Sequence, residues 1–123
     1  MTPTRWTAVA FAVGRLAFGA ALVAAPGRTA SGWLGDDSAR PGTKVAVRGL
    51  GARDLALSAG VLAAAPGGDL RPWLAACVGC DLSDIAATLA AGDALPERAR
   101  IGTVALAGAA AAAGGALLAA VSR

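Results

Sequence analysis

Charged side chains interrupt three of the four long apolar runs in this chain, each time near the middle of the run. The residues near the middle are Arg15, Arg53, Asp54, Asp81 and Asp84, and Arg48 lies about a turn and a half closer to one end of the second run. Guanidinium and carboxylate groups bind each other with two parallel hydrogen bonds, and ionisable groups inside a membrane are candidates for binding a proton or a small polar ligand. These six residues therefore form the candidate polar network.

A second candidate pair is the C-x-x-C sequence at Cys77 and Cys80. Some membrane redox proteins carry such a motif, but here it lies inside an apolar run and has no second cysteine pair. Two thiols are too few for a zinc site, and the chain has no histidine. The cysteines are interpreted as small apolar filler, with a thiol redox protein as the weaker alternative. We expect no enzyme activity, catalytic residue, metal or cofactor.

The composition indicates an integral membrane protein. Of 123 residues, 56% are hydrophobic and 15% charged, and the mean hydropathy is +0.60. A soluble domain averages about 25% charged residues and rarely exposes large apolar patches. The net charge of +3 comes from scattered basic residues without interleaved aromatics, which argues against nucleic-acid binding. The expected partner is a lipid bilayer, with a homo-oligomer or a larger membrane complex as a further expectation.

The four apolar runs cover residues 6–25, 45–65, 73–91 and 101–121. Each is about 20 residues long, as a helix that crosses the bilayer must be. Residues 1–123 are therefore predicted to form one all-α domain, an antiparallel four-helix transmembrane bundle in the cell membrane. Thr43 and Asp69 are predicted to cap the second and third helices, and Pro96 and Glu97 to lie in the first turn of the fourth.

The first connection, residues 27–44, differs from the other two because it is longer and contains Trp33-Leu34 between polar flanks. It is either a segment lying at the membrane interface or a solvated loop anchored by one tryptophan. Basic residues favour the first and third connections being cytoplasmic, which places both termini outside. Arg15 splits the first run, which argues against a cleaved signal peptide.

The charges in the middle of the runs are expected to pair. A central Arg or Asp costs roughly 2.5–3.5 kcal/mol on insertion scales, so unpaired charges would prevent these Ala-rich helices from entering lipid independently. Three arginines and three aspartates make a neutral set. Cys77, Asp81, Asp84 and Thr88 share one helix face, which should point inward.

Arg15 is the expected partner of Asp81 and Asp84. Arg53 and Asp54 lie about 100° apart around their helix, so we expect that they cannot face each other. They are expected to reach different neighbours, one toward the first or third helix and the other toward Arg15 or Arg48. Small residues would let the helices approach closely. They are Gly49, Gly51, Ala52, Ala56 and Gly60 in the second run and Gly108, Ala112 and Gly115 in the fourth.

Three stretches carry a family resemblance: "GRLAFGAALVAAP" (14–26), "RGLGARDLALSAG" (48–60) and "DLSDIAATL" (81–89). Their R-G-x-G-x-R-D-x-x-L and D-x-x-D patterns resemble a family of small bacterial four-helix membrane proteins of unknown function. The resemblance implies that Arg48, Arg53, Asp54, Asp81 and Asp84 are signature positions, and Ser58 stands where glycine would be expected. The helix count is similar to that of DoxX-like membrane proteins.

Two interpretations of the network stay open. It is either an ion-pair lattice that fixes the helix register in a structural or interaction component of the membrane, or the lining of a site for a proton or small ligand.

Overall fold

The structure, a computed structural model that describes residues 1–123, contains helices and no strands. Its four long helices are α1 (Pro3–Ala24), α3 (Pro41–Ala64), α4 (Arg71–Ala91) and α5 (Glu97–Val121). A short helix, α2 (Pro26–Leu34), and two 3₁₀ helices, η1 (Gly35–Ala39) and η2 (Gly92–Ala94), lie between them. The predicted all-α class is confirmed.

Three helical segments are long and apolar enough to cross a membrane: α1, α4 with η2, and α5. Helix α3 is as long as these but is not one of the three, because it carries Lys44, Arg48, Arg53 and Asp54. The residues that pair with these charges are therefore needed to explain how α3 packs among the three apolar helices.

The helix starts follow local chemistry. Helices α1 and α3 begin at Pro3 and Pro41, where the missing N–H of proline is harmless. The predicted cap at Thr43 is wrong, because α3 begins two residues earlier at that proline. The predicted cap at Asp69 is wrong by one residue, because the N-cap of α4 is Leu70; the carboxylate of Asp69 still accepts the backbone N–H of Arg71 at 3.0 Å. Glu97 lies in the first turn of α5, which Pro96 directly precedes.

The first connection is folded, and its central feature is helix α2. This helix begins at Pro26, directly after α1 ends, and its Ala30 packs against Leu22 of α1 and Val47 of α3. The ring of Trp33 lies 6.3 Å from that of Phe18 in α1. A simple solvated loop is therefore wrong for this segment, because apolar contacts order it into a helix.

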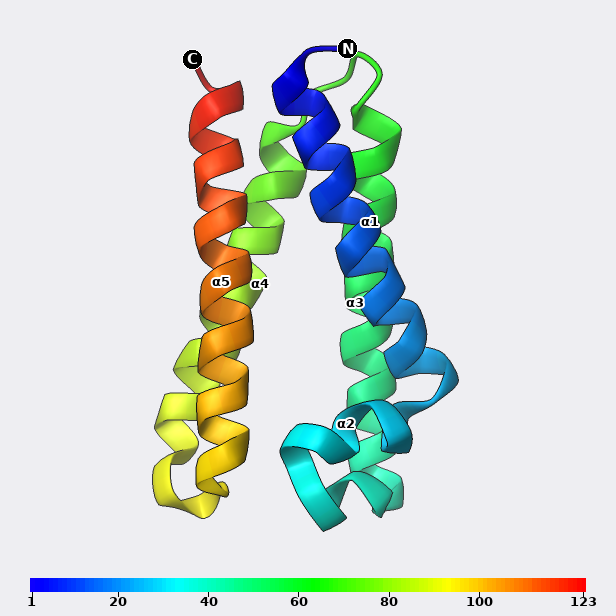
Figure 1. Ribbon diagram of the computed structural model, residues 1–123, viewed down its shortest axis with the longest axis vertical. Coiled ribbons are helices and arrows are strands. Elements are labelled where there is room, and N and C mark those ends of the chain that lie inside the picture. Colours follow the sequence, from blue (N-terminus) through cyan, green and yellow to red (C-terminus); the bar gives the residue numbers. More distant parts are fainter.

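The long helices pair as two antiparallel hairpin-like layers (Figure 1). Helix α1 packs along α3, and α4 packs along α5, while contacts between the two pairs are fewer. One apolar cluster joins the layers near the chain termini: it contains Ala8 and Ala12 from α1, Val61 and Ala64 from α3, Leu70, Leu74 and Cys77 from the α4 side, and Leu117 from α5. At the opposite end, α2 contacts α5.

Glycines allow the closest helix contact. A Cβ on Gly51 of α3 would stand 2.6 Å from the carbonyl oxygen of Gly19 in α1, so the two backbones touch. Gly60 accommodates the ring of Trp73 from α4. In α5 the predicted contact glycines Gly108 and Gly115 meet no neighbour, because the contact face of that helix carries Gly114 instead, against Val78 and Phe11.

Candidate functional site

Arg15 is the centre of the polar network. Its Nη1 and Nη2 donate to Oδ2 and Oδ1 of Asp81 at 2.9 and 2.8 Å, a two-pronged pairing of α1 with α4. The same Nη2 donates to Oδ1 of Asp54 at 3.0 Å, which adds α3. The three side chains are only 7%, 6% and 6% exposed. One guanidinium therefore joins three helices inside the protein.

Arg53 and Asp84 form the second pairing. Nη1 and Nη2 of Arg53 donate to Oδ1 and Oδ2 of Asp84 at 3.0 and 2.8 Å. This pair is 29% and 30% exposed, so it lies at the edge of the network. The prediction that Arg15 would serve both aspartates of α4 is thus half right: it pairs with Asp81, and Arg53 takes Asp84.

Arg53 and Asp54 do reach different neighbouring helices, α4 and α1, as expected. The prediction that the two cannot face each other is wrong, since Nη2 of Arg53 also lies 3.5 Å from Oδ1 of Asp54. Backbone geometry separates the two Cβ atoms by about 100°. The long arginine stem overcomes this separation, because it bends toward α4 and carries the guanidinium past the neighbouring carboxylate.

Arg48 does not belong to the network. It is exposed, and its Nε donates to the carbonyl of Val23 at 3.1 Å, in the last turn of α1. Arg5 does the converse: its guanidinium donates to the carbonyls of Ala64, Ala65 and Gly68 at 2.9–3.1 Å, at the end of α3. Carbonyls at a helix end lack intrahelical partners, and a cation there complements the helix dipole. Each helix of this layer therefore caps the other.

The removal of Arg48 from the network changes its charge. Two arginines now face three aspartates, so the fully ionised network carries one net negative charge instead of none. The predicted inward stripe of α4 is confirmed for Cys77, Asp81 and Thr88, which are buried, while Asp84 is half-buried at its edge. No group of carboxylate and thiol side chains in the chain has the geometry of a metal site.

Three polar atoms in or near the network are buried without a hydrogen-bond partner: Nε of Arg15, Nε of Arg53 and Oγ of Ser58. Ser58 is fully buried one helical turn beyond Asp54, on the same face of α3. Sequence reasoning identified this serine only as a departure from an expected glycine. Its position four residues after Asp54 was the signal that could have linked it to the network.

The two cysteines have different surroundings. Cys77 is buried in the apolar cluster beside Leu74, whereas Cys80 is half-buried, and both are free thiols. Nothing else in the structure distinguishes them as a redox pair.

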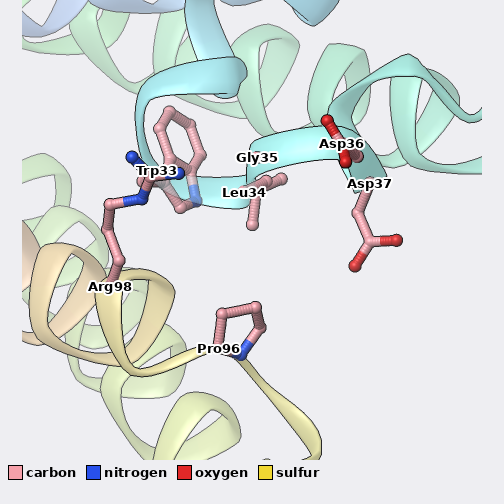
Figure 2. Close-up of a pocket in the computed structure, with 7 residues that line it drawn as sticks. All are labelled: Trp33, Leu34, Gly35, Asp36, Asp37, Pro96 and Arg98. Carbon is pink, nitrogen blue, oxygen red and sulfur yellow. The ribbon is translucent and has the colours of Figure 1, made fainter.

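Two surface pockets lie at opposite ends of the molecule, away from the network. The larger, about 340 Å³, surrounds the α3–α4 turn near Arg5 and Asp69. The other, about 260 Å³, lies between η1 and the start of α5; Figure 2 shows Arg98 extending toward Trp33 while Asp36 and Asp37 lie apart from it. Neither pocket brings together a set of convergent polar groups.

Comparisons with known proteins identify no relative: no protein-family model, no curated protein and no solved structure matches the chain.

Proposed function

We propose that the protein is a small polytopic protein of the cell membrane, in which α1, α3, α4 and α5 all cross the bilayer as one four-helix bundle. On this proposal it is a structural or interaction component that associates with itself or with a larger membrane complex. The observation that carries the proposal is the ion-pair network of Arg15, Asp54 and Asp81, which joins three helices at mid-length.

The network supports a transmembrane position for α3. Each central charge of this helix has a partner outside it: Arg53 pairs with Asp84, and Asp54 with Arg15. Arg48, nearer the helix start, bonds the end of α1. A charge that is paired and hydrogen-bonded no longer needs water to the same degree, so the insertion cost that α3 would carry alone is reduced.

The outward surface supports membrane embedding and association. Several large apolar side chains are exposed on the long helices: Trp6, Val13, Val45, Leu82, Leu89, Ile101 and Leu106. On a soluble monomer such a surface would be an aggregation hazard, whereas lipid or a partner helix would cover it. The basic rim at the end that holds the first and third connections supports a cytoplasmic location for that end.

Topology mapping tests the four-span proposal. Single cysteines are introduced at Asp36 in η1 and at Gly67 after α3, in a chain with Cys77→Ala and Cys80→Ala, and are labelled in intact cells with a membrane-impermeant reagent. Labelling of Gly67→Cys but not Asp36→Cys is expected, because α3 separates the two positions. Equal labelling of both before membrane rupture, or protection of both, would mean that α3 does not cross.

Native mass measurement in mild detergent, with cross-linking in membranes, tests association. A species of two or more chains, or a stable complex with another membrane protein, is expected. A lone monomer under both conditions would contradict the interaction role.

A second candidate function is the handling of a proton or a small ligand by the same network. It is favoured by the net charge of −1 that two arginines and three aspartates give the fully ionised network. It is also favoured by the partial exposure of Arg53 and Asp84, which connects the buried groups to the surface of the protein.

A further inference from the structure

We propose that the network of Arg15, Arg53, Asp54, Asp81 and Asp84 is a proton-binding site, in which Asp54 holds one exchangeable proton at neutral pH. This inference deepens the second candidate function above. It rests on the proposed transmembrane placement in one respect only: an uncompensated charge is costly there. It specifies a proton as the ligand and Asp54 as the residue that binds it.

The first argument is charge. Two guanidinium groups face three carboxyl groups, all within the 2.8–3.5 Å contacts that link them. An unbalanced charge in a low-dielectric interior is costly, and the usual response is that one group becomes neutral. Arginine keeps its proton in proteins, so a carboxyl must be the group that changes.

No other charge is placed to compensate. Helix α1 has no charged residue between Arg5 and Arg28 except Arg15, and α5 has none between Arg100 and Arg123. Beyond Asp81 and Asp84, helix α4 adds the thiols of Cys77 and Cys80 and, ten residues before Asp81, Arg71, which pairs with Asp69. Helix α2 and η1, with Arg28, Asp36 and Asp37, pack near Val47, which lies about 10 Å along α3 from Asp54.

The second argument is the distribution of hydrogen bonds, which selects Asp54 among the three carboxyls. Asp81 and Asp84 each use both oxygens in a two-pronged pairing with one arginine. Asp54 uses Oδ1 alone, which accepts one bond at 3.0 Å from Arg15 and one long contact at 3.5 Å from Arg53. Its Oδ2 accepts none of the side-chain hydrogen bonds of the protein and is the free position for a proton.

The third argument is an uncommitted hydroxyl. Oγ of Ser58 is fully buried, has no hydrogen-bond partner, and belongs to the same face of α3 one turn from Asp54. A buried hydroxyl without a partner is costly, whereas a protonated carboxyl supplies both a donor and an acceptor on this face. The serine therefore supplies an uncommitted hydroxyl on the face of Asp54, which can accept a hydrogen bond from a protonated carboxyl as well as donate one.

Exchange requires only a proton. A proton from the aqueous phase adds to Oδ2 of Asp54, an O–H bond forms, and the carboxylate becomes a neutral carboxyl; release is the reverse. Asp54 itself is 6% exposed, while the adjoining Arg53 and Asp84 are about five times more exposed. The route for exchange therefore leads past the Arg53–Asp84 pair.

Infrared spectroscopy of the full chain in lipid nanodiscs tests the proposal. At neutral pH the protein should show the carbonyl band of one protonated carboxylic acid, with a shift in D2O. Asp54→Asn should remove this band and leave thermal stability within a few degrees, because the amide mimics the neutral acid. The control Asp36→Asn, at an exposed position, should keep the band. Arg53→Gln should keep a single band, because Asp84 is about 30% exposed and solvent can solvate its carboxylate when the partner is lost.

Absence of the band in the parent protein would overturn the proposal, as would its survival in Asp54→Asn. So would a sodium-dependent rise in melting temperature, relative to choline at equal ionic strength, in a parent protein without the band. A sodium ion would then neutralise the network. The infrared band is measured separately from topology and oligomeric state, so the two proposals can fail separately. A monomer that shows the band would contradict the interaction role alone. An oligomer without the band would contradict only the proton site.

Discussion

Replacing Arg15 should be the most damaging single change in the polar network. In Arg15→Met the side chain keeps an unbranched apolar stem but loses three hydrogen bonds of 2.8–3.0 Å, two to Asp81 and one to Asp54. Both acidic side chains are 6% exposed: Asp81 would lose its cation, and Asp54 would lose its shortest hydrogen bond. Removal of one partner from a buried ion pair costs about 3–5 kcal/mol, so we expect a loss of that size in the free energy of unfolding.

Arg53→Met provides the matched comparison. Its pairing with Asp84 also has two short hydrogen bonds, but both side chains are about 30% exposed. Solvent screens such a pair and can solvate the abandoned carboxylate, so the expected loss is smaller, about 1–2 kcal/mol. Arg48→Met removes one bond to a backbone carbonyl at an exposed site and should cost less than about 1 kcal/mol.

Reversible unfolding in mixed micelles, followed by far-UV circular dichroism during titration with a denaturing detergent, measures these free energies. The double variant Arg15→Met with Asp81→Leu adds a stricter test. Because it also removes the abandoned carboxylate of Asp81, its free energy of unfolding should exceed that of Arg15→Met alone by about 1–3 kcal/mol. The reasoning fails if Arg15→Met unfolds like the parent, or if the double variant is no more stable than the single one.

Two further predictions concern packing and pH. Gly51→Val should separate α1 from α3 and lower the melting temperature strongly, because a Cβ at that position would meet the carbonyl of Gly19. The control Gly49→Val, on the open face, should leave the melting temperature nearly unchanged. Equal melting temperatures of the two variants would contradict the close approach of the helices. Hydrogen bonds from the side chain and backbone N–H of Arg71 lower the pKa of Asp69, which lies outside the helices. The stabilisation by Asp69 is therefore present above the ordinary aspartate pKa and is lost as pH falls through the lowered one. NMR titration should place the pKa of Asp69 below that of an unstructured aspartate, and Arg71→Gln, which keeps the backbone N–H, should raise it toward that value.

The sequence was sufficient to locate the polar network but not to assign its pairs. Arg15, Asp54 and Asp81 were identifiable because each interrupts an apolar run at the same depth, and the i, i+3 spacing placed Asp81 and Asp84 on one face. Which guanidinium takes which carboxylate depends on helix rotation and on the bending of a long side chain. Neither is specified by spacing, and this is why the contact of Arg53 with its neighbour Asp54 was missed.

Arg48 shows a second limit of sequence reasoning. Charge counting assigned Arg48 to the network because it made the net charge of the network zero. In the structure Arg48 instead binds a carbonyl at the end of α1, where carbonyls lack partners within the helix. Arg5 meets the same demand at the end of α3. In an antiparallel helix pair the start of one helix lies beside the end of the other, so basic residues in the first two or three turns are expected to bind these carbonyls. Local helix chemistry therefore took precedence over charge balance.

The loss of Arg48 to helix capping connects the fold to the proposed proton site. Had this arginine joined the network, three cations would have matched three carboxylates, and no group would need to change its ionisation. With Arg48 committed to Val23, the neutral state of the network requires one protonated carboxyl, and hydrogen bonding leaves only Oδ2 of Asp54 uncommitted. A variant that returns a cation should therefore displace the proton. Ser58→Lys is the strictest version: it places an amine one turn from Asp54, and loss of the protonated-acid band with retained helicity is expected. Persistence of that band in a folded Ser58→Lys protein would show that charge balance does not control the site.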